Sequence, residues 1–101
     1  AARTAFASTP SDWRQAIKTD LERLAKARPT AVNLCWALEC MQTIIAQTEG
    51  NPEDVLLQEA IRIHKGDINA NHHMGELGAA LIEQSCSVLT HCNTGSLATG
   101  G

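Results

Sequence analysis

The segment SVLTHCNTGS, residues 87–96, decides the fold class, because the pattern of the chain changes there from helical to extended. Val88, Leu89 and Thr90 favour a short strand over residues 87–91. The residues from Cys92 to Ser96 are turn formers. Helices, then a strand, then a glycine-containing turn are how an α/β domain begins. The segment therefore predicts a mainly α fragment that leads into the first strand of an α/β domain.

A single strand has no partner for its N–H and C=O groups, and unpaired backbone groups are costly to bury. We therefore expect the 101 residues to be a fragment, with the rest of the sheet elsewhere in the protein or in another chain. The expected boundaries are 1–84 for a partial helical N-terminal domain and 85–101 for the first strand and turn of a truncated α/β domain.

Upstream of that segment, the spacing of apolar residues predicts helices. Residues 1–8 are small and polar and predict a loose lead-in. Thr9 as a cap and Pro10 at the first helical position predict a helix that ends near Arg28, just before Pro29. Trp13, Ile17, Leu21 and Leu24 would form its buried face.

Two further helices are expected after Pro29. One spans about residues 30–49 and is apolar around most of its circumference, so it should be a buried central helix. The next opens at Asn51-Pro52-Glu53-Asp54, with residues such as Leu56 and His64 on its inner face. Between Gly66 and Gly78 poor helix formers are frequent, so residues 66–82 predict either one kinked helix or two helices in tandem.

Composition limits the classes of partner. The formal net charge is −3, and the basic residues form no stripe that could neutralise a nucleic-acid backbone. No apolar run approaches the roughly 20 residues that a membrane helix needs. The first residues lack the apolar core of a secretory signal. We therefore expect neither nucleic acid nor membrane as a partner, and a cytoplasmic protein, also nuclear if the source is eukaryotic.

The four cysteines do not predict a metal or disulfide framework. Their spacing matches neither paired CxxC units nor a dense disulfide scaffold. Cys35, Cys40 and Cys86 are expected to be free and mostly buried thiols. His72 and His73 are adjacent, so on a helix they would diverge by about 100°. We therefore expect no metal site.

Cys92 is the residue with the clearest chemical potential. At the end of a strand it would stand where open α/β sheets bind ligands, and the N–H groups of the following turn could bind an anion and lower the thiol pKa. His91 would point to the opposite face, so a Cys–His pair is not expected. The residues alone leave a second interpretation open, in which Cys92 is a small core residue and Gly95 a plain turn residue.

Arg28 is the second candidate. An arginine just ahead of a helix N-terminus would add a forked cation to dipolar N–H groups, which is a good arrangement for a phosphate. The alternative is a solvated arginine at a helix end.

Two segments resemble hallmark stretches of the thioribose-phosphate isomerases of methionine salvage. They are RPTAVNL followed by WALE, within residues 28–39, and LTHCNTGSLATGG, residues 89–101. Residues 67–71 and 75–82 also fit that family, so the resemblance covers roughly residues 11–101. Cys35 departs from it, because an aromatic residue is expected there.

The resemblance implies a helical N-terminal domain that leads into a Rossmann-like α/β domain, in a homodimeric enzyme that uses no metal or nucleotide cofactor. The implied reaction converts 5-methylthioribose 1-phosphate into the corresponding ribulose 1-phosphate. Cys92 would act in the hydrogen transfer between C1 and C2, as acid/base or as transition-state stabiliser. Arg28 would hold the substrate phosphate, and Asn93, Thr94 and Gly95 would shape the pocket.

The same resemblance places an arginine-glycine-alanine motif before residue 1, and a catalytic aspartate and an asparagine-lysine pair after residue 101. We therefore expect the remainder of the enzyme to be a necessary partner and the isolated chain to be inactive. Three alternatives remain. One is a non-catalytic regulatory subunit of a translation initiation exchange factor, which is not expected to keep Cys92 before Asn-Thr-Gly, and another is a ribose-1,5-bisphosphate isomerase. The third is a helical interaction module, which is what the periodicity alone supports.

Overall fold

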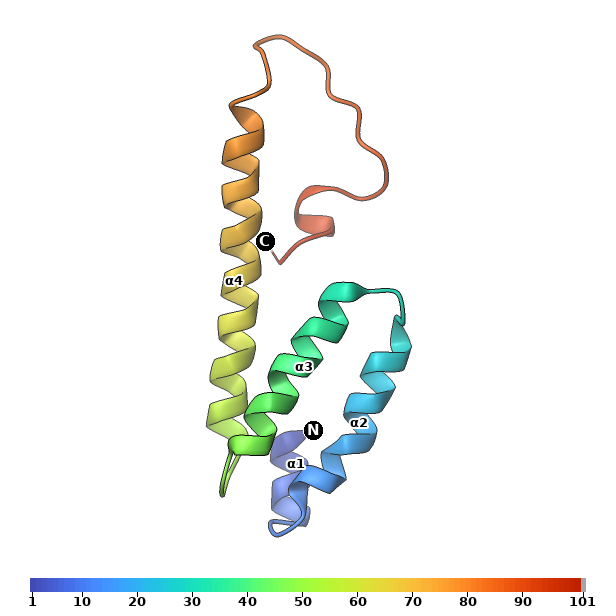
Figure 1. Cartoon of the computed structure of the whole chain (residues 1–101), viewed down its shortest axis with the longest axis vertical. Helices are drawn as coiled ribbons and strands as arrows, with labels where there is room; N and C mark the ends of the chain where they lie inside the picture. The colour runs from blue at the N-terminus through green and yellow to red at the C-terminus, as the bar shows by residue number, and fades with distance from the viewer. Residues whose placement is uncertain (101) are drawn as a thin grey trace. The chain divides into compact units, whose positions relative to one another are not determined.

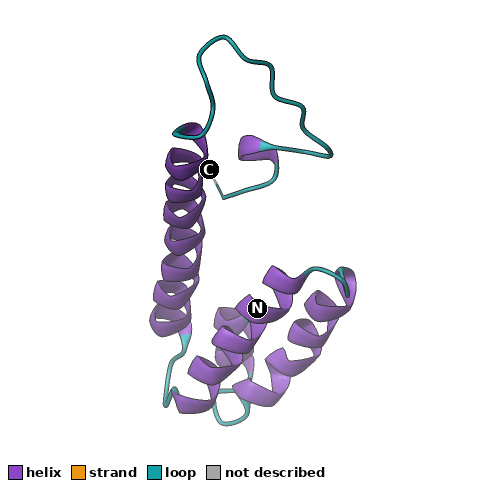
Figure 2. Cartoon of the chain, turned by 45° about the horizontal axis from the view of Figure 1, so that its top comes forward, coloured by secondary structure: helices purple, strands orange, loops and turns teal. Residues whose placement is uncertain are grey.

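The structure is a computed structural model that describes residues 1–100. These residues form α1 (Ala2–Ser8), α2 (Trp13–Ala27), α3 (Val32–Gln47), α4 (Glu53–Ala79) and a 3-10 turn, η1 (Gly95–Leu97), as Figures 1 and 2 show. The chain divides into two compact units, Ala1–Ile61 and Arg62–Gly101, and α4 contributes to both. Within the described residues, no helix combines the length and the apolarity that crossing a membrane requires.

The core of the first unit brings α2, α3 and the beginning of α4 together. Trp13 and Ile17 of α2 are each 3% exposed, and they meet Ile45 of α3 and Leu56 of α4. Trp13 and Ile17 lie four residues apart and therefore share one face of α2, as their spacing predicted. Burying one such side chain contributes about 1.5–3 kcal/mol, so this cluster is the main support of the unit.

Arg14 fastens α2 to the end of α3. Its Nε donates a hydrogen bond to the carbonyl oxygen of Ile45 at 3.0 Å, and its Nη2 donates to the carbonyl oxygen of Thr48. The guanidinium also lies 5.0 Å from the centre of the Trp13 ring. The last carbonyls of a helix lack partners within the helix and attract cations, so one side chain satisfies two of them.

The beginning of the chain differs from the prediction. Residues 1–8 were expected to be loose, but Ala2–Ser8 form α1. Ala2, Ala5 and Phe6 are half-buried against the core cluster, at the helical spacing i, i+3, i+4. Thr9 does not cap α2, which begins at Trp13 with Asp12 at the N-cap and no side-chain cap bond. Packing of Phe6 outweighs the weak local signal of a small, polar segment.

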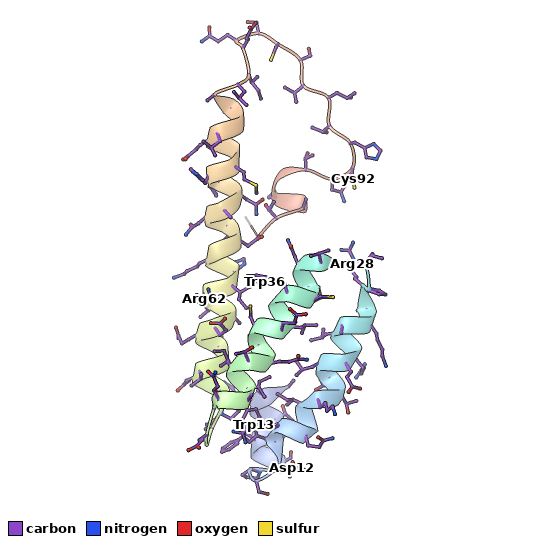
Figure 3. The ribbon with its side chains drawn as sticks, in the orientation of Figure 1. Asp12, Trp13, Arg28, Trp36, Arg62 and Cys92 are labelled. Atoms are coloured by element: carbon purple, nitrogen blue, oxygen red, sulfur yellow. The ribbon has the colours of Figure 1, made fainter. Side chains whose placement is uncertain are left out.

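The second predicted helix is present as α3, but it is not buried on all sides. Leu38 and Ile45 are buried, whereas Val32 is 76% exposed and Trp36 is 49% exposed. Figure 3 labels Trp36 on α3. The helix that packs along α3 is α2. One neighbouring helix covers only about one face, so Val32 and Trp36 are exposed in this chain, whereas Met41 and Ile44 are half-buried against the core.

The third predicted helix and the glycine-containing segment form one helix. Asn51 Oδ1 accepts a hydrogen bond from the Glu53 N–H at 3.0 Å, and α4 then continues through Gly66 and Gly75 to Ala79. Of the two expected arrangements, the structure has a single helix. Its end at Ala79 corrects the expectation of helix through residue 82, because residues 80–82 form a turn.

The predicted strand is absent. Residues 86–91 have no regular secondary structure, residues 87–91 are exposed, and residues 1–100 contain no strand. The physical reason is that a single strand leaves its backbone N–H and C=O groups without partners. A strand needs a neighbour to pair with, and these residues find none in the described chain.

Candidate functional site

The loop that follows α4 turns sharply at Cys92. This residue has φ = +69°, in the left-handed region that residues with a Cβ rarely adopt. Cys92 is exposed, and Figure 3 shows it in the loop between α4 and η1. Two expectations are thereby corrected: Cys92 does not end a strand, and in this chain it is not a core residue.

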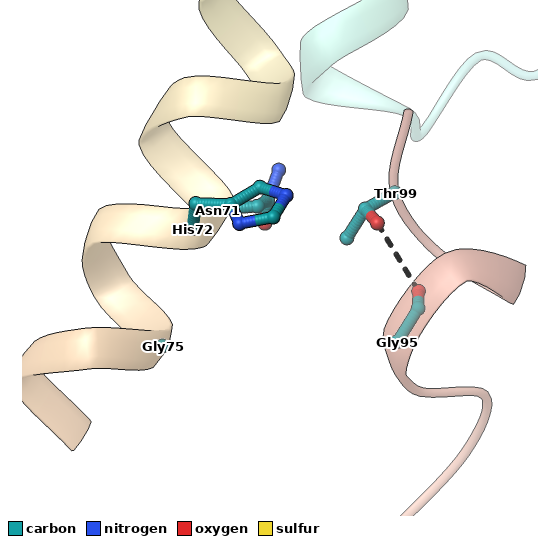
Figure 4. Close-up of a pocket in the computed structure, with 5 residues that line it drawn as sticks. All are labelled: Asn71, His72, Gly75, Gly95 and Thr99. Atoms are coloured by element: carbon teal, nitrogen blue, oxygen red, sulfur yellow. Dashed lines mark hydrogen bonds between the residues drawn. The ribbon is translucent and has the colours of Figure 1, made fainter. Parts of the chain in front are cut away.

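A compact turn follows the cysteine. The carbonyl oxygen of Gly95 accepts hydrogen bonds from the Ala98 N–H at 2.9 Å and from the Thr99 Oγ1 hydroxyl at 3.2 Å. Figure 4 draws the second of these bonds. Gly95 has φ = +63°, so glycine is the residue that forms this turn at least cost. The two bonds close the turn over residues 95–99.

Residues on α4 hold the end of this turn. The Gly100 N–H donates to Asp67 Oδ2 at 2.9 Å. Asn71, one turn further along α4, donates from Nδ2 to the Asp67 carbonyl oxygen at 2.8 Å. A Cβ at position 100 would lie 3.0 Å from Asp67 Oδ2 and 3.0 Å from His64 Nδ1. The backbone at Gly100 thus lies close to two side chains of α4.

An open cavity of about 470 Å³ lies between α4 and the turn. It is lined by Asn71, His72 and Gly75 from α4 and by Gly95 and Thr99 from the turn. In Figure 4 the side chains of Asn71 and His72 project from α4 toward Thr99. The volume is within the range of small-molecule sites, and the amide, imidazole and hydroxyl groups suit a polar ligand. Cys92 is not among the lining residues.

Arg28 lies in the connection between α2 and α3. It is the C-cap residue of α2, is exposed, and its carbonyl oxygen accepts from the Ala31 N–H at 3.0 Å. The following helix, α3, has Ala31 at its N-cap, no side-chain cap bond and no acidic residue in its first turn. Arg28 belongs to the first unit, whereas Cys92 and its loop belong to the second.

The other predicted site residues are next to Cys92. Asn93 and Thr94 are exposed, and Thr94 is the N-cap of η1 without a side-chain cap bond. All four cysteines are free. Cys35 and Cys40 are half-buried, whereas Cys86 is exposed, which corrects its expected burial.

No three His, Cys, Asp or Glu side chains gather as a metal site within residues 1–100. His73 Nδ1 instead lies 3.8 Å from Glu76 Oε2 on its own helix. His64 was expected on an apolar face, but it is exposed and close to Gly100. The anchoring role of Asp67 was not predicted. The one available signal was the spacing of Asp67 and Asn71, which are four residues apart and share a helix face.

Comparisons with known proteins agree with one another. The Initiation factor 2 subunit family matches residues 1–100. The chain is 55% identical over 100 residues to a protein of Methylococcus capsulatus, covering 99% of this chain and 28% of that protein. It is 57% identical to proteins of Nitrosococcus oceani and Thioalkalivibrio sulfidiphilus, covering 100% of this chain and 30% and 29% of those proteins.

All three proteins are named methylthioribose-1-phosphate isomerase, and the chain spans under a third of their length. No solved structure matches the chain. Because the family match extends over the whole described sequence, the chain belongs to the initiation factor 2 subunit family.

Proposed function

We propose that the full-length protein carrying this sequence isomerises 5-methylthioribose 1-phosphate to 5-methylthioribulose 1-phosphate in methionine salvage. The observation that supports this most strongly is the identity of 55–57% to isomerases of that name over almost every residue of the chain. The chain spans 28–30% of the length of those relatives.

The reaction is a balanced internal redox step. The bond between C1 and the ring oxygen breaks, the hydrogen on C2 moves to C1, and the C2 hydroxyl becomes a carbonyl. The proton that the C2 hydroxyl loses goes to the freed ring oxygen, which becomes a hydroxyl. C1 is reduced and C2 is oxidised, so no external oxidant or reductant takes part and no cofactor is required. The protein must hold the phosphate, supply a group beside C1 and C2, and keep the reacting atoms in place.

Cys92 is the group that we assign to the hydrogen transfer, as acid/base or as transition-state stabiliser. Its exposure leaves the thiol accessible to a substrate. The turn after it supplies backbone N–H groups, which favour the thiolate when they point toward the sulfur. Asn93, Thr94 and Gly95 would shape the pocket, and the positive φ of Gly95 gives the turn the curvature to do so.

Arg28 is assigned to the substrate phosphate. Its guanidinium is exposed, and the nearby N-terminus of α3 is not capped by a side chain. A cation and unpaired helical N–H groups are the two features that bind phosphate in many proteins.

The wider architecture belongs to the same proposal. We assign residues 1–84 to a helical N-terminal domain and residues 85–101 to the opening of a Rossmann-like domain, in which Ser87–His91 become a strand once neighbouring strands are present. The assembly is a homodimer, and the protein is cytoplasmic. Neither nucleic acid nor membrane is a partner.

The test is to incubate the full-length protein with 5-methylthioribose 1-phosphate and to follow the ketose product by NMR. Conversion supports the proposal, and ribose 1,5-bisphosphate serves as the competing substrate. No conversion of either sugar would indicate a non-catalytic subunit, and conversion of the bisphosphate alone would change the assigned substrate. The isolated 101-residue chain is expected to be inactive, because the resemblance places several substrate-binding groups outside it.

A further inference from the structure

We infer that Asp67 is a positioning residue, which fixes the Cys92 loop on α4 through the backbone of Gly100. The inference rests on the proposed function, because it assigns a residue to the site of that reaction. Asp67 would not touch the substrate. It would set the place of the turn that follows the reacting thiol.

A hydrogen bond joins Asp67 of α4 to Gly100 of the loop. Asp67 Oδ2 accepts the Gly100 N–H at 2.9 Å, a normal length for a hydrogen bond to a carboxylate. The two residues are 33 positions apart in the sequence, so the contact is a tertiary one. The bond is exposed to solvent, and its charged acceptor makes it stronger than an equivalent bond to a neutral oxygen.

There is little space around Gly100 where it contacts Asp67. A Cβ at position 100 would meet Asp67 Oδ2 and His64 Nδ1, each at 3.0 Å. A side chain at position 100 would therefore crowd the Asp67 carboxylate and the His64 ring, and one of these groups or the loop backbone would have to shift. His64 and Asp67 lie on the same face of α4, since they are three residues apart. Together they leave little space for a side chain at position 100.

The turn between Gly95 and Gly100 links the contact with Asp67 to the part of the loop that contains Cys92. Gly95 O accepts from the Ala98 N–H and the Thr99 hydroxyl, so hydrogen bonds link Gly95 to the residue that precedes Gly100. Cys92 is three residues before Gly95, in a strained left-handed conformation. Two of the cavity's lining residues, Gly95 and Thr99, belong to the same turn. Loss of the Asp67 anchor would therefore misplace the thiol and open the cavity wall.

The carboxylate of Asp67 is suited to binding the loop backbone and unsuited to binding the substrate. Its negative charge would repel the phosphate of the proposed substrate, so direct substrate binding by Asp67 is unfavourable. Asn71 Nδ2 donates to the Asp67 backbone oxygen at 2.8 Å and extends the polar row along α4 toward the cavity. The carboxylate instead accepts the N–H of Gly100 in the loop.

The experiment uses the full-length protein with three single variants: Asp67→Ala, Asp67→Asn and Glu76→Ala. Asp67→Ala removes the acceptor, whereas Asp67→Asn keeps an oxygen that can accept the Gly100 N–H. Glu76→Ala is the matched control, because Glu76 is a carboxylate on the same helix that faces His73. Hydrogen exchange of the peptide containing residues 95–100 is measured alongside kcat, KM and Tm.

We expect faster exchange of residues 95–100 in Asp67→Ala, near-normal exchange in Asp67→Asn, and no change in Glu76→Ala. We also expect kcat of Asp67→Ala to fall about 10- to 100-fold with KM within about twofold, since small misplacements of reacting groups cost that much. Asp67→Asn should recover most of kcat. Gly100→Ala approaches the same contact from the loop and should reproduce the faster exchange even if Asp67→Ala folds poorly.

Unchanged exchange at residues 95–100 in both Asp67→Ala and Gly100→Ala would overturn the inference, whatever the activity. A fall in Tm with kcat and exchange unaltered would also overturn it, because Asp67 would then act on stability alone. If the exchange effects appear but the parent protein converts no sugar, Asp67 does fix the loop on α4, whereas the proposed function is wrong. The two failures are therefore distinguishable.

Discussion

Replacing Arg14 by methionine removes the link between α2 and the end of α3 while keeping a side chain of similar length. Two hydrogen bonds from the guanidinium, to the carbonyl oxygens of Ile45 and Thr48, are lost together with the contact to the Trp13 ring. A hydrogen bond from a charged donor contributes about 1.5–3 kcal/mol, and an exposed cation–π contact about 0.5–1 kcal/mol.

These contributions do not simply add. Arg14 is exposed, so water replaces part of what the freed carbonyl groups lose. We therefore expect Arg14→Met to lower the free energy of unfolding by about 1–3 kcal/mol in all. For a chain of this size each kcal/mol lowers Tm by about 4–8 °C, so Tm should fall by roughly 5–20 °C.

Urea unfolding followed by tryptophan fluorescence measures this change. Trp13 is buried beside Arg14, and a Trp36→Phe background leaves Trp13 as the single reporter. Arg23→Met is the control, because Arg23 lies on the same helix and makes only a 3.8 Å ion pair with Asp20 at the surface. The control should change stability by less than about 0.5 kcal/mol. Equal losses in Arg14→Met and Arg23→Met would refute the claim that Arg14 joins the two helices.

Three further predictions concern single positions. Gly50→Ala should destabilise the chain by about 1–2 kcal/mol because Gly50 has φ = +71°. Gly66→Ala lies in a helix with open space around it and should stabilise the chain by up to about 1 kcal/mol. The two substitutions should therefore shift the urea midpoint in opposite directions. The hydrogen bond from Arg3 lowers the pKa of Glu53 below its ordinary value of 4.5, so the stabilisation is fully present above that value and is lost as pH falls through the lowered one. The urea midpoint of the wild-type chain should therefore decline more than that of Arg3→Met as the pH falls below 4.5, and parallel declines would contradict this. Iodoacetamide should modify the exposed Cys86 and Cys92 before the half-buried Cys35 and Cys40, with mass spectrometry of the peptides as the readout.

Local sequence signals predicted the helices with strong start signals and clear spacing. Pro10 preceded α2 and Pro52 preceded α4, and the four-residue spacing of Trp13 and Ile17 identified their shared buried face. Such signals act within one or two turns of the chain, so they are legible without tertiary structure.

Features that depend on distant contacts could not be predicted in this way. The first helix, α1, forms where Phe6 packs on the core. The segment has only 7 residues, most of them small or polar, so its sequence alone does not indicate a helix. The strand over residues 87–91 was predicted from side-chain preference, but a strand also requires a neighbour. The contact of Asp67 with Gly100 joins residues 33 positions apart, and no local pattern specifies it.

The assignment of Cys92 to the chemistry is tested most directly by kcat of the full-length protein with Cys92→Ser and, separately, Cys86→Ser. Both cysteines are exposed and lie six residues apart, so the second substitution controls for the loss of a surface thiol in the same loop. The account predicts that Cys92→Ser lowers kcat by about 10²–10⁴-fold with Tm unchanged, and that Cys86→Ser stays within about twofold of the parent. Equal kcat values for Cys92→Ser and Cys86→Ser would contradict it.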